Sequence, residues 1–182
     1  VRKPGTVGPP LPGVSVRICD DSMEDVPLGQ PGEVCVSGRN VMAGYWNDPE
    51  GTAEAIHDGW LRTGDIGVLD DDGYLSIVDR KKDMIIVGGM NVYPREVEDV
   101  IYGLSEVAEV AVIGVPSRLR GEDVKAFIAL KEGAQLGAQA VIDHCAARLA
   151  NYKVPRAVEF RPELVKSGTG KVLKRVLRAE QA

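Results

Sequence analysis

The stretch Ser167-Gly168-Thr169-Gly170-Lys171 contains the residue types that can hold a phosphate. Its two glycines permit an open backbone, and the lysine follows them where the pattern predicts a helix to start. Free N–H groups and the positive dipole end at such a start favour an anion. Five basic residues and no acidic residue between positions 166 and 178 would strengthen that field. The alternative is a solvated basic helix that binds nothing.

This stretch does not have the spacing of a P-loop. A P-loop needs Gly, four residues and then Gly-Lys-Ser/Thr, so that backbone N–H groups wrap the phosphates and the hydroxyl reaches the metal. Here Val165 occupies the first glycine position and Val172 the hydroxyl position. We therefore predict a phosphate-directed loop of another kind.

The composition limits the class of protein. The chain has 182 residues, which suffices for one large domain or two small ones, and its 44% hydrophobic and 27% charged residues are typical of a globular protein. A net charge of −5 argues against nucleic acid as a partner. The sequence contains no signal peptide and no apolar run near the roughly 20 residues that span a bilayer. We expect a cytoplasmic protein without a transmembrane segment.

No metal site is expected. Cys19, Cys35 and Cys145 are widely spaced and include no Cys-x-x-Cys pair, which indicates reduced core residues rather than a disulfide framework or a zinc site. His57 and His144 have no ligand partners at metal spacing.

The first part of the chain reads as antiparallel β-structure. Residues 14–40 alternate as strands, and Asp48-Pro49 predicts a capped helix that runs to about Ile56. Short strands at 67–69 and 74–78 are joined by the turn Asp70-Asp71-Asp72-Gly73.

The second part mixes helices and strands. Apolar residues at helical spacing follow Pro94. Further strands are predicted at 107–115, 124–131 and 157–161, and further helices at 137–150 and 171–181. We predict an α+β fold, with a β-rich part at 1–79, a charged bridge at 80–83 and a small α+β domain at 84–182.

Five stretches carry a family resemblance: GYWNDPE, DGWLRTGDIG, DGYLSIVDRKKDMIIVGGMNVYPREVE, NYKVP and KSGTGKVLKRVLR. In this order they resemble the C-terminal part of the adenylate-forming superfamily, which includes acyl-CoA synthetases, adenylation domains of peptide synthetases, and luciferases. The wording GGMNVYPREVE is most similar to medium- and long-chain fatty acyl-CoA synthetases. The resemblance makes 1–79 the C-terminal end of the large adenylating domain, 80–83 the hinge, and 84–182 the mobile C-terminal domain.

The resemblance implies a two-step ligase. Such enzymes couple a carboxylic acid with ATP to give acyl-adenylate and pyrophosphate, and then rotate the small domain so that the CoA thiol displaces AMP. The substrates would be a fatty or other carboxylic acid, ATP and CoA. The Mg²⁺ ligand, the phosphate loop and most of the acyl pocket would lie upstream of this chain.

The resemblance also implies roles for single residues. Asp65 matches the carboxylate that accepts hydrogen bonds from the ribose hydroxyls, and the set of motifs favours this role over the alternative of an Asp that caps a turn after Gly64. Arg80 matches a ribose-contacting arginine, against the alternative of an ion pair with Asp79 or Asp83. Lys82 matches the hinge position.

Three further residues are matched in the small domain. Gly88 and Gly89 match the loop that lines the pantetheine channel, although a glycine turn between short strands predicts the same residues. Lys171 matches the lysine that bridges the substrate carboxylate and the α-phosphate. Val165 departs from the family, which usually has proline before Lys166, so this loop should be less rigid.

The chain opens without Met and is expected to be a fragment that does not adenylate an acid alone. Apolar faces such as Val34 and Val36 would then be exposed, and self-association would follow. Two alternatives stay open: the end of a peptide-synthetase adenylation domain, and a non-catalytic module that binds an anion. The absence of a carrier domain after the last helix favours the free-standing ligase.

Overall fold

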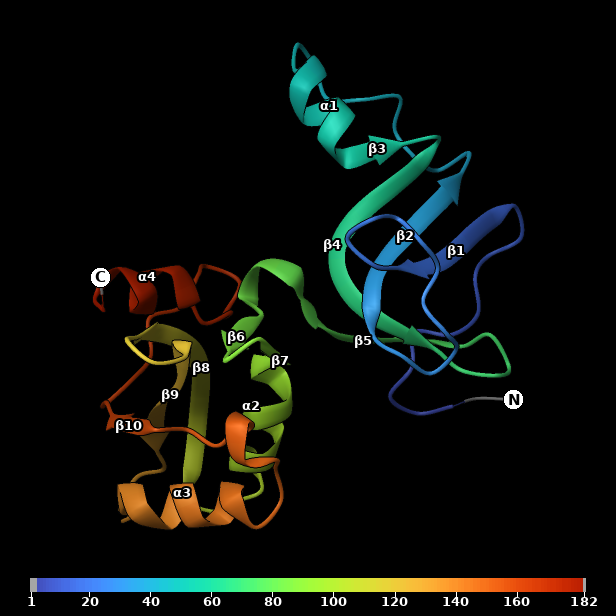
Figure 1. Cartoon of the computed structure of the whole chain (residues 1–182). Helices are drawn as coiled ribbons and strands as arrows, with labels where there is room; N and C mark the ends of the chain where they lie inside the picture. The colour runs from blue at the N-terminus through green and yellow to red at the C-terminus, as the bar shows by residue number, and fades with distance from the viewer. Residues whose placement is uncertain (1–2, 182) are drawn as a thin grey trace. The chain divides into compact units, whose positions relative to one another are not determined.

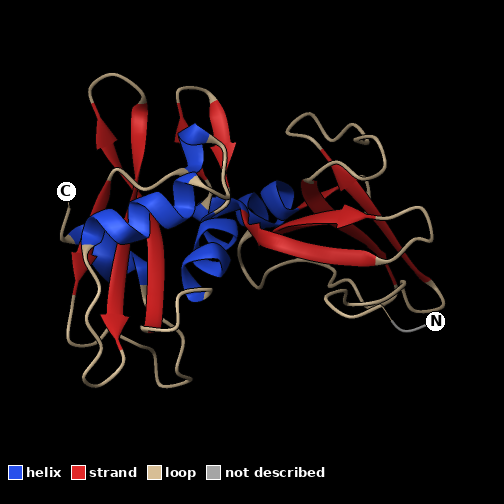
Figure 2. Cartoon of the chain, turned by 90° about the horizontal axis from the view of Figure 1, so that it is seen from below, coloured by secondary structure: helices blue, strands red, loops and turns tan. Residues whose placement is uncertain are grey.

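The computed structural model describes residues 3–181 and divides into two compact units, Val1–Lys82 and Asp83–Ala182. The division lies inside the segment 80–83 that was predicted to be a hinge. Figure 2 shows that helices form much more of the second unit than of the first. The predicted α+β fold is confirmed.

A five-stranded sheet forms the first unit (Figure 1). Strands β1, β2 and β4 lie side by side, and β3 and β5 each pair with a different half of β4, so every pairing is antiparallel. The strands are β1 (Val14–Cys19), β2 (Gly32–Gly38), β3 (Ile56–His57), β4 (Trp60–Leu69) and β5 (Leu75–Arg80).

Strand β4 is longer than its sequence pattern indicates. It begins at Trp60, whereas the strand was predicted to begin at residue 67. Leu61 pairs with Val36 of β2 on one side and with Ile56 of β3 on the other. This pairing on both edges extends the strand through glycines that weaken the local signal.

The predicted cap of the first helix is confirmed. Helix α1 (Pro49–Ala55) begins with proline, and the Asp48 carboxylate accepts a hydrogen bond of 2.9 Å from the Gly51 N–H. This bond satisfies one of the orphan donors of the first turn.

Val34 does not lie on an exposed apolar face, so that prediction is wrong. Its side chain is buried and packs so closely against Gly67 that a Cβ there would lie 2.6 Å from Val34 Cγ2. Val36 is half-buried. Close packing against Gly67 of the neighbouring strand β4 helps to bury Val34 within its own sheet.

The second unit is a sheet covered by helices on both faces. Its strands are β6 (Ile85–Val87), β7 (Met90–Val92), β8 (Val107–Ser117), β9 (Gly121–Leu130) and β10 (Ala157–Phe160). Strand β9 pairs with β8 in antiparallel and with β10 in parallel orientation. The helices are α2 (Pro94–Tyr102), α3 (Ala138–Ala146) and α4 (Lys174–Ala179), and short 3₁₀ turns occupy η1 (Lys81–Asp83) and η2 (Asn151–Lys153).

Alternation along β8 and β9 builds the two cores of this unit. Val110 and Val112 join the larger core with α2 and α3, where Val97 and Val141 are fully buried. The opposite face is covered by Leu164 and by Leu177 of α4, which pack with the following sheet residues: Ala111, Ile113, Phe127 and Ala129. Burial of Leu177 thus docks α4 on the sheet.

Two helices are shorter than predicted. Helix α3 ends at Ala146 instead of residue 150, and α4 begins at Lys174 instead of Lys171. Among the described residues, no helix has the length and apolar character needed to cross a membrane.

Candidate functional site

Asp65 and Arg80 lie opposite each other on β4 and β5. The Arg80 Nε is 3.3 Å from the Asp65 Oδ1, so the arginine pairs with Asp65, while the expected alternative Asp83 pairs with Arg178. The structure therefore brings together the two residues that the sequence predicted for one ribose.

The exposure of this pair leaves room for a ligand. The Asp65 side chain is 33% exposed and that of Arg80 is 60% exposed. An ionised carboxylate has about four lone-pair sites, of which one arginine donor uses only one. The remaining acceptor sites can accept hydrogen bonds from the two hydroxyl groups of a vicinal diol on a ligand.

Glu33 is a site residue that the sequence reasoning missed. It lies on β2 with 4% exposure, and it is the one charged residue in the described part of the chain whose surface is buried to this degree. It binds the Arg62 and Lys81 side chains, which are 29 and 48 residues away in the sequence. The available signal was an acidic residue at the head of the apolar run Val34-Cys35-Val36.

Lys171 lies in a tight hairpin and not at a helix start. The Ser167 N–H donates to the Lys171 carbonyl at 2.8 Å, and Lys166 forms a bridge with Val172. Gly170 completes the turn with a φ of 81°. These backbone bonds delay the helix until Lys174, so the predicted helix start at Lys171 is wrong, while an exposed lysine near the turn remains.

Most of the basic charge around this hairpin is already paired. Lys166 bonds to Glu109, the Lys174 Nζ lies 2.7 Å from the Glu98 Oε1, and the Arg178 Nη2 lies 2.8 Å from the Asp83 Oδ1. Three of the five cations are therefore locally neutralised.

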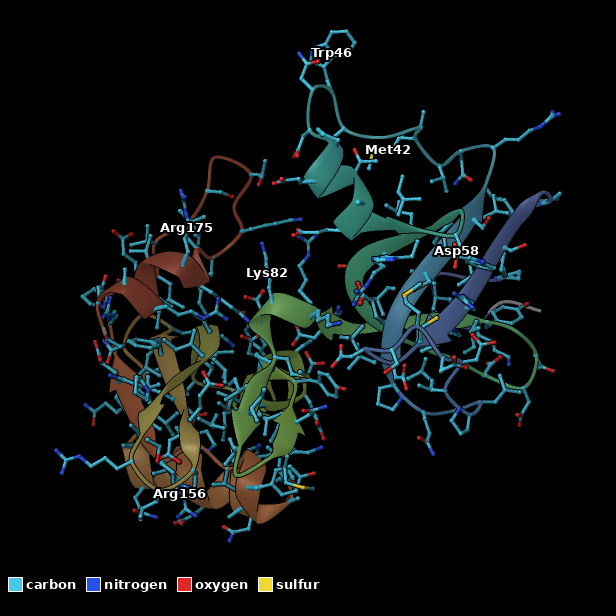
Figure 3. All side chains as sticks on the ribbon, turned by 45° about the horizontal axis from the view of Figure 1, so that its top comes forward. Met42, Trp46, Asp58, Lys82, Arg156 and Arg175 are labelled. Atoms are coloured by element: carbon cyan, nitrogen blue, oxygen red, sulfur yellow. The ribbon has the colours of Figure 1, made fainter. Side chains whose placement is uncertain are left out.

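Lys171 and Arg175 are the two cations of this segment that stay available. Both are exposed, and the structure of residues 3–181 gives neither side chain an acidic partner. Figure 3 labels Arg175 on α4. Lys171 differs from Arg175 because it is carried by the hairpin, whose base includes the ion-paired Lys166.

Gly88 and Gly89 form the turn between β6 and β7. Their φ values of 58° and 81° are the left-handed conformations of a two-residue hairpin turn. The Gly88 N–H donates to the Arg120 carbonyl at 2.8 Å, which ties the turn to the β8–β9 connection. A Cβ on either glycine would meet nothing within 4 Å, so the space beside the turn is open.

The other residues singled out in the sequence have structural contacts. Lys82 (Figure 3) is exposed on η1 at the boundary between the units. Tyr152 packs on the larger core and the Lys153 Nζ lies 2.6 Å from the Glu96 Oε2, while His144 Nε2 lies 3.0 Å from the Val100 carbonyl oxygen. Within the described residues no cluster of three or more His, Cys, Asp or Glu could hold a metal.

Both ends of the chain match models of one enzyme family. Residues 1–46 match the AMP-binding enzyme family, and residues 96–171 match the AMP-binding enzyme C-terminal domain. The second match ends at Lys171.

The chain is similar to several ligases over nearly its whole length. It is 52% identical over 177 residues to a long-chain-fatty-acid–CoA ligase of Yersinia pestis, covering 97% of this chain and 31% of that protein. It is 50% identical over 177 residues to a Rhodococcus jostii CoA ligase named for a methyl-dioxo-octahydro-indenyl propanoyl group, covering 97% of this chain and 32% of that ligase. The chain thus spans about a third of the length of these relatives.

The chain is also similar to a solved structure over nearly its whole length. ATP-bound MatB from Rhodopseudomonas palustris superposes with a TM-score of 0.94 at 42% identity, covering 99% of this chain and 36% of that chain.

Proposed function

We propose that this chain forms the C-terminal part of an AMP-forming acyl-CoA synthetase, because two of its segments match models of AMP-binding enzymes. In the first step a carboxylate oxygen attacks the α-phosphorus of ATP, and pyrophosphate leaves. In the second step the CoA thiol attacks the acyl carbonyl carbon, AMP leaves with the electron pair of the broken C–O bond, and the thiol proton passes to solvent. The observation that carries this proposal is the 52% identity to a fatty-acid–CoA ligase over 97% of the chain.

The proposal gives Lys171 a role in the first step. Negative charge moves from the carboxylate and the α-phosphate to the leaving pyrophosphate, and an ammonium between the two reacting groups would stabilise that shift. A lysine suits this task because it is a compact cation on a flexible stem. Its exposure and its lack of an acidic partner in the described chain support the assignment.

Asp65 and Arg80 would hold the ribose of ATP and of the acyl-adenylate. The Asp65 carboxylate would accept hydrogen bonds from both hydroxyls, and Arg80 would orient that carboxylate through the contact at 3.3 Å.

The remaining assignments concern the second step. The open space beside Gly88 and Gly89 suits the thin pantetheine arm of CoA, which needs backbone without side chains. Lys82 would be a hinge residue, because it is exposed at the boundary between the units.

The substrates follow from the same proposal. MatB is named as ATP-bound and the Yersinia relative as a long-chain-fatty-acid–CoA ligase, so we infer ATP, CoA and a fatty acid. The Mg²⁺ that accompanies ATP would be held by residues upstream of this sequence. Because the chain spans 31% of that relative, activity has to be measured in the full-length protein.

The decisive variant is Lys171→Ala in the full-length protein. Acyl-adenylate formation, followed by ATP–pyrophosphate exchange with a fatty acid, should fall about a hundredfold or more, the range seen when one stabilising donor of a transition state is removed. Thioester formation from supplied acyl-adenylate should be largely retained. Arg175→Ala is the matched control, because Arg175 is the other exposed cation without an acidic partner in the described segment.

Two results would contradict the proposal. Equal loss of both half-reactions in Lys171→Ala would exclude a role specific to adenylation. An unaltered protein without pyrophosphate exchange on any carboxylic acid would exclude the ligase itself.

A further inference from the structure

The buried carboxylate of Glu33 lies beside the Asp65–Arg80 pair. Glu33 accepts hydrogen bonds at its Oε2 from Arg62 Nε at 3.0 Å, from Arg62 Nη2 at 2.7 Å and from Lys81 Nζ at 2.9 Å. Its Oε1 accepts the Gly64 backbone N–H at 3.2 Å. A single side chain on β2 thereby binds β4 and the residue that follows β5.

The positions of these partners connect Glu33 to the pair. Gly64 immediately precedes Asp65 in β4, and Lys81 immediately follows Arg80 at the end of β5. Asp65 and Arg80 face each other in the strand register. Glu33 therefore holds the two residues that flank the pair on the same side.

The conformation of Gly64 makes this contact important. Gly64 has a φ of 71°, and β4 has a register irregularity between Ile66 and Gly67. Backbone of this kind is less constrained by the ladder, so it needs other contacts to hold one conformation. The Glu33 oxygen supplies one directly before Asp65.

Glu33 is built to remain charged at this place. Burial alone would raise the pKa of its carboxyl, but the hydrogen bonds from Arg62 and Lys81 bring that pKa below its usual value. Lys81 has a second acidic partner in Asp21 at 2.6 Å, and the Asp21 side chain is 88% exposed. Asp21 thus shares Lys81 with Glu33, whereas the hydrogen bonds from Arg62 and Gly64 go to Glu33 in the described residues.

We propose that Glu33 is a positioning residue for nucleotide binding, which sets Asp65 and Arg80 in the arrangement that accepts the vicinal diol of a ribose. This inference rests on the proposed function, because it requires that Asp65 binds that diol. Glu33 itself would touch neither the nucleotide nor the reacting atoms.

The test measures how strongly the enzyme senses one ribose hydroxyl. In the full-length protein, KM in the adenylation reaction is determined for ATP and for 2′-deoxyATP. The ratio of KM for 2′-deoxyATP to KM for ATP reports the hydrogen bond to the 2′-hydroxyl. Loss of a hydrogen bond to a charged group should make this ratio about tenfold or more in the unaltered enzyme. In Glu33→Gln the ratio should fall toward one, with a raised KM for ATP and an unchanged KM for the acid.

The control is Asp21→Asn, which removes the exposed partner of Lys81 and should leave the ratio unchanged. If Glu33→Gln does not fold, Lys81→Met replaces it, because it removes one of the contacts at a side chain that is 30% exposed. In Lys81→Met the KM ratio should fall about threefold, which is less than in Glu33→Gln because only one of the contacts of Glu33 is lost.

The outcomes separate the two proposals. A ratio that stays at the unaltered value in Glu33→Gln, or in Lys81→Met where that variant is used, overturns the positioning role while the ligase function stands. An unaltered enzyme that forms no acyl-adenylate overturns the proposed function instead.

Discussion

The lysines of the segment 166–174 carry the same charge but differ in whether an acidic side chain pairs with them. Lys166, Lys171 and Lys174 are equivalent in the sequence pattern, yet Lys166 and Lys174 are bonded to Glu109 and Glu98. An ammonium that already neutralises a carboxylate is less available to a phosphate. The sequence pattern drew attention to Lys171 as the lysine after two glycines, but only the resemblance to a family motif gave it a role.

Glu33 marks the limit of what residue patterns predict. Its charged partners lie on β4 and directly after β5, 29 and 48 residues later in the sequence, so only the folded sheet brings them together. The same holds for Arg80, whose partner Asp65 was not among the two acids expected from local sequence. The acids expected to pair with Arg80 were those close to it in the sequence. The strand register, which depends on the packing of the whole sheet, instead places Asp65 opposite it.

The three cysteine thiols should be unreactive in the native chain. All are buried and free, and burial raises the pKa of Cys35 to about 12 and that of Cys145 to about 11. At pH 8 only about one Cys145 in a thousand would be a thiolate, even where a reagent could reach it. A thiol-disulfide reagent with a coloured product should therefore titrate less than one thiol per native chain within minutes.

The control for this prediction is the same chain in concentrated guanidinium chloride, where all three thiols should react. A rapidly reacting thiol in the native chain would mean that the β1–β2 sheet or α3 opens locally.

At the scale of elements, helix starts were harder to predict than helix existence. Helix α4 was expected from its residues and is present, but it begins three residues late, because the Ser167–Lys171 backbone bond and the Lys166–Val172 bridge form a hairpin first. Where an N-cap with a proper acceptor exists, as at Asp48, the predicted start was correct. Leu173 at the corresponding position of α4 offers no side-chain acceptor.

The hairpin gives an element-scale prediction with a matched control. Gly170 has a φ of 81°, and alanine there should cost about 1 kcal/mol of local strain, whereas Gly168 has no positive φ and open space around its Cα. Gly170→Ala should therefore slow acyl-adenylate formation in the full-length protein about fivefold. Gly168→Ala should leave it near the unaltered rate, and pyrophosphate exchange measures both. Equal rates for the two variants would show that the hairpin conformation does not set the position of Lys171.

For the molecule as a whole, the two units differ in how well each buries its own apolar residues. The described residues include five buried hydrophobic side chains in the first unit and twenty in the second. A unit of roughly this size with so small a core has little hydrophobic stabilisation of its own. The expected apolar exposure thus exists, but it lies on loops and not at Val34.

We predict that the 182-residue chain self-associates through its first unit. Leu11, Leu28 and Trp46 are all more than half exposed there, and Trp46 (Figure 3), at 91%, projects from the loop before α1. Association would remove such surface from water, which is favourable by about 25 cal/mol per Å² of apolar area. Light scattering should show a mean mass that rises with concentration, and serine at these three positions should reduce the rise. Leu119→Ser is the control, because Leu119 is 96% exposed but lies in the second unit. A constant monomer mass at high concentration would contradict this prediction.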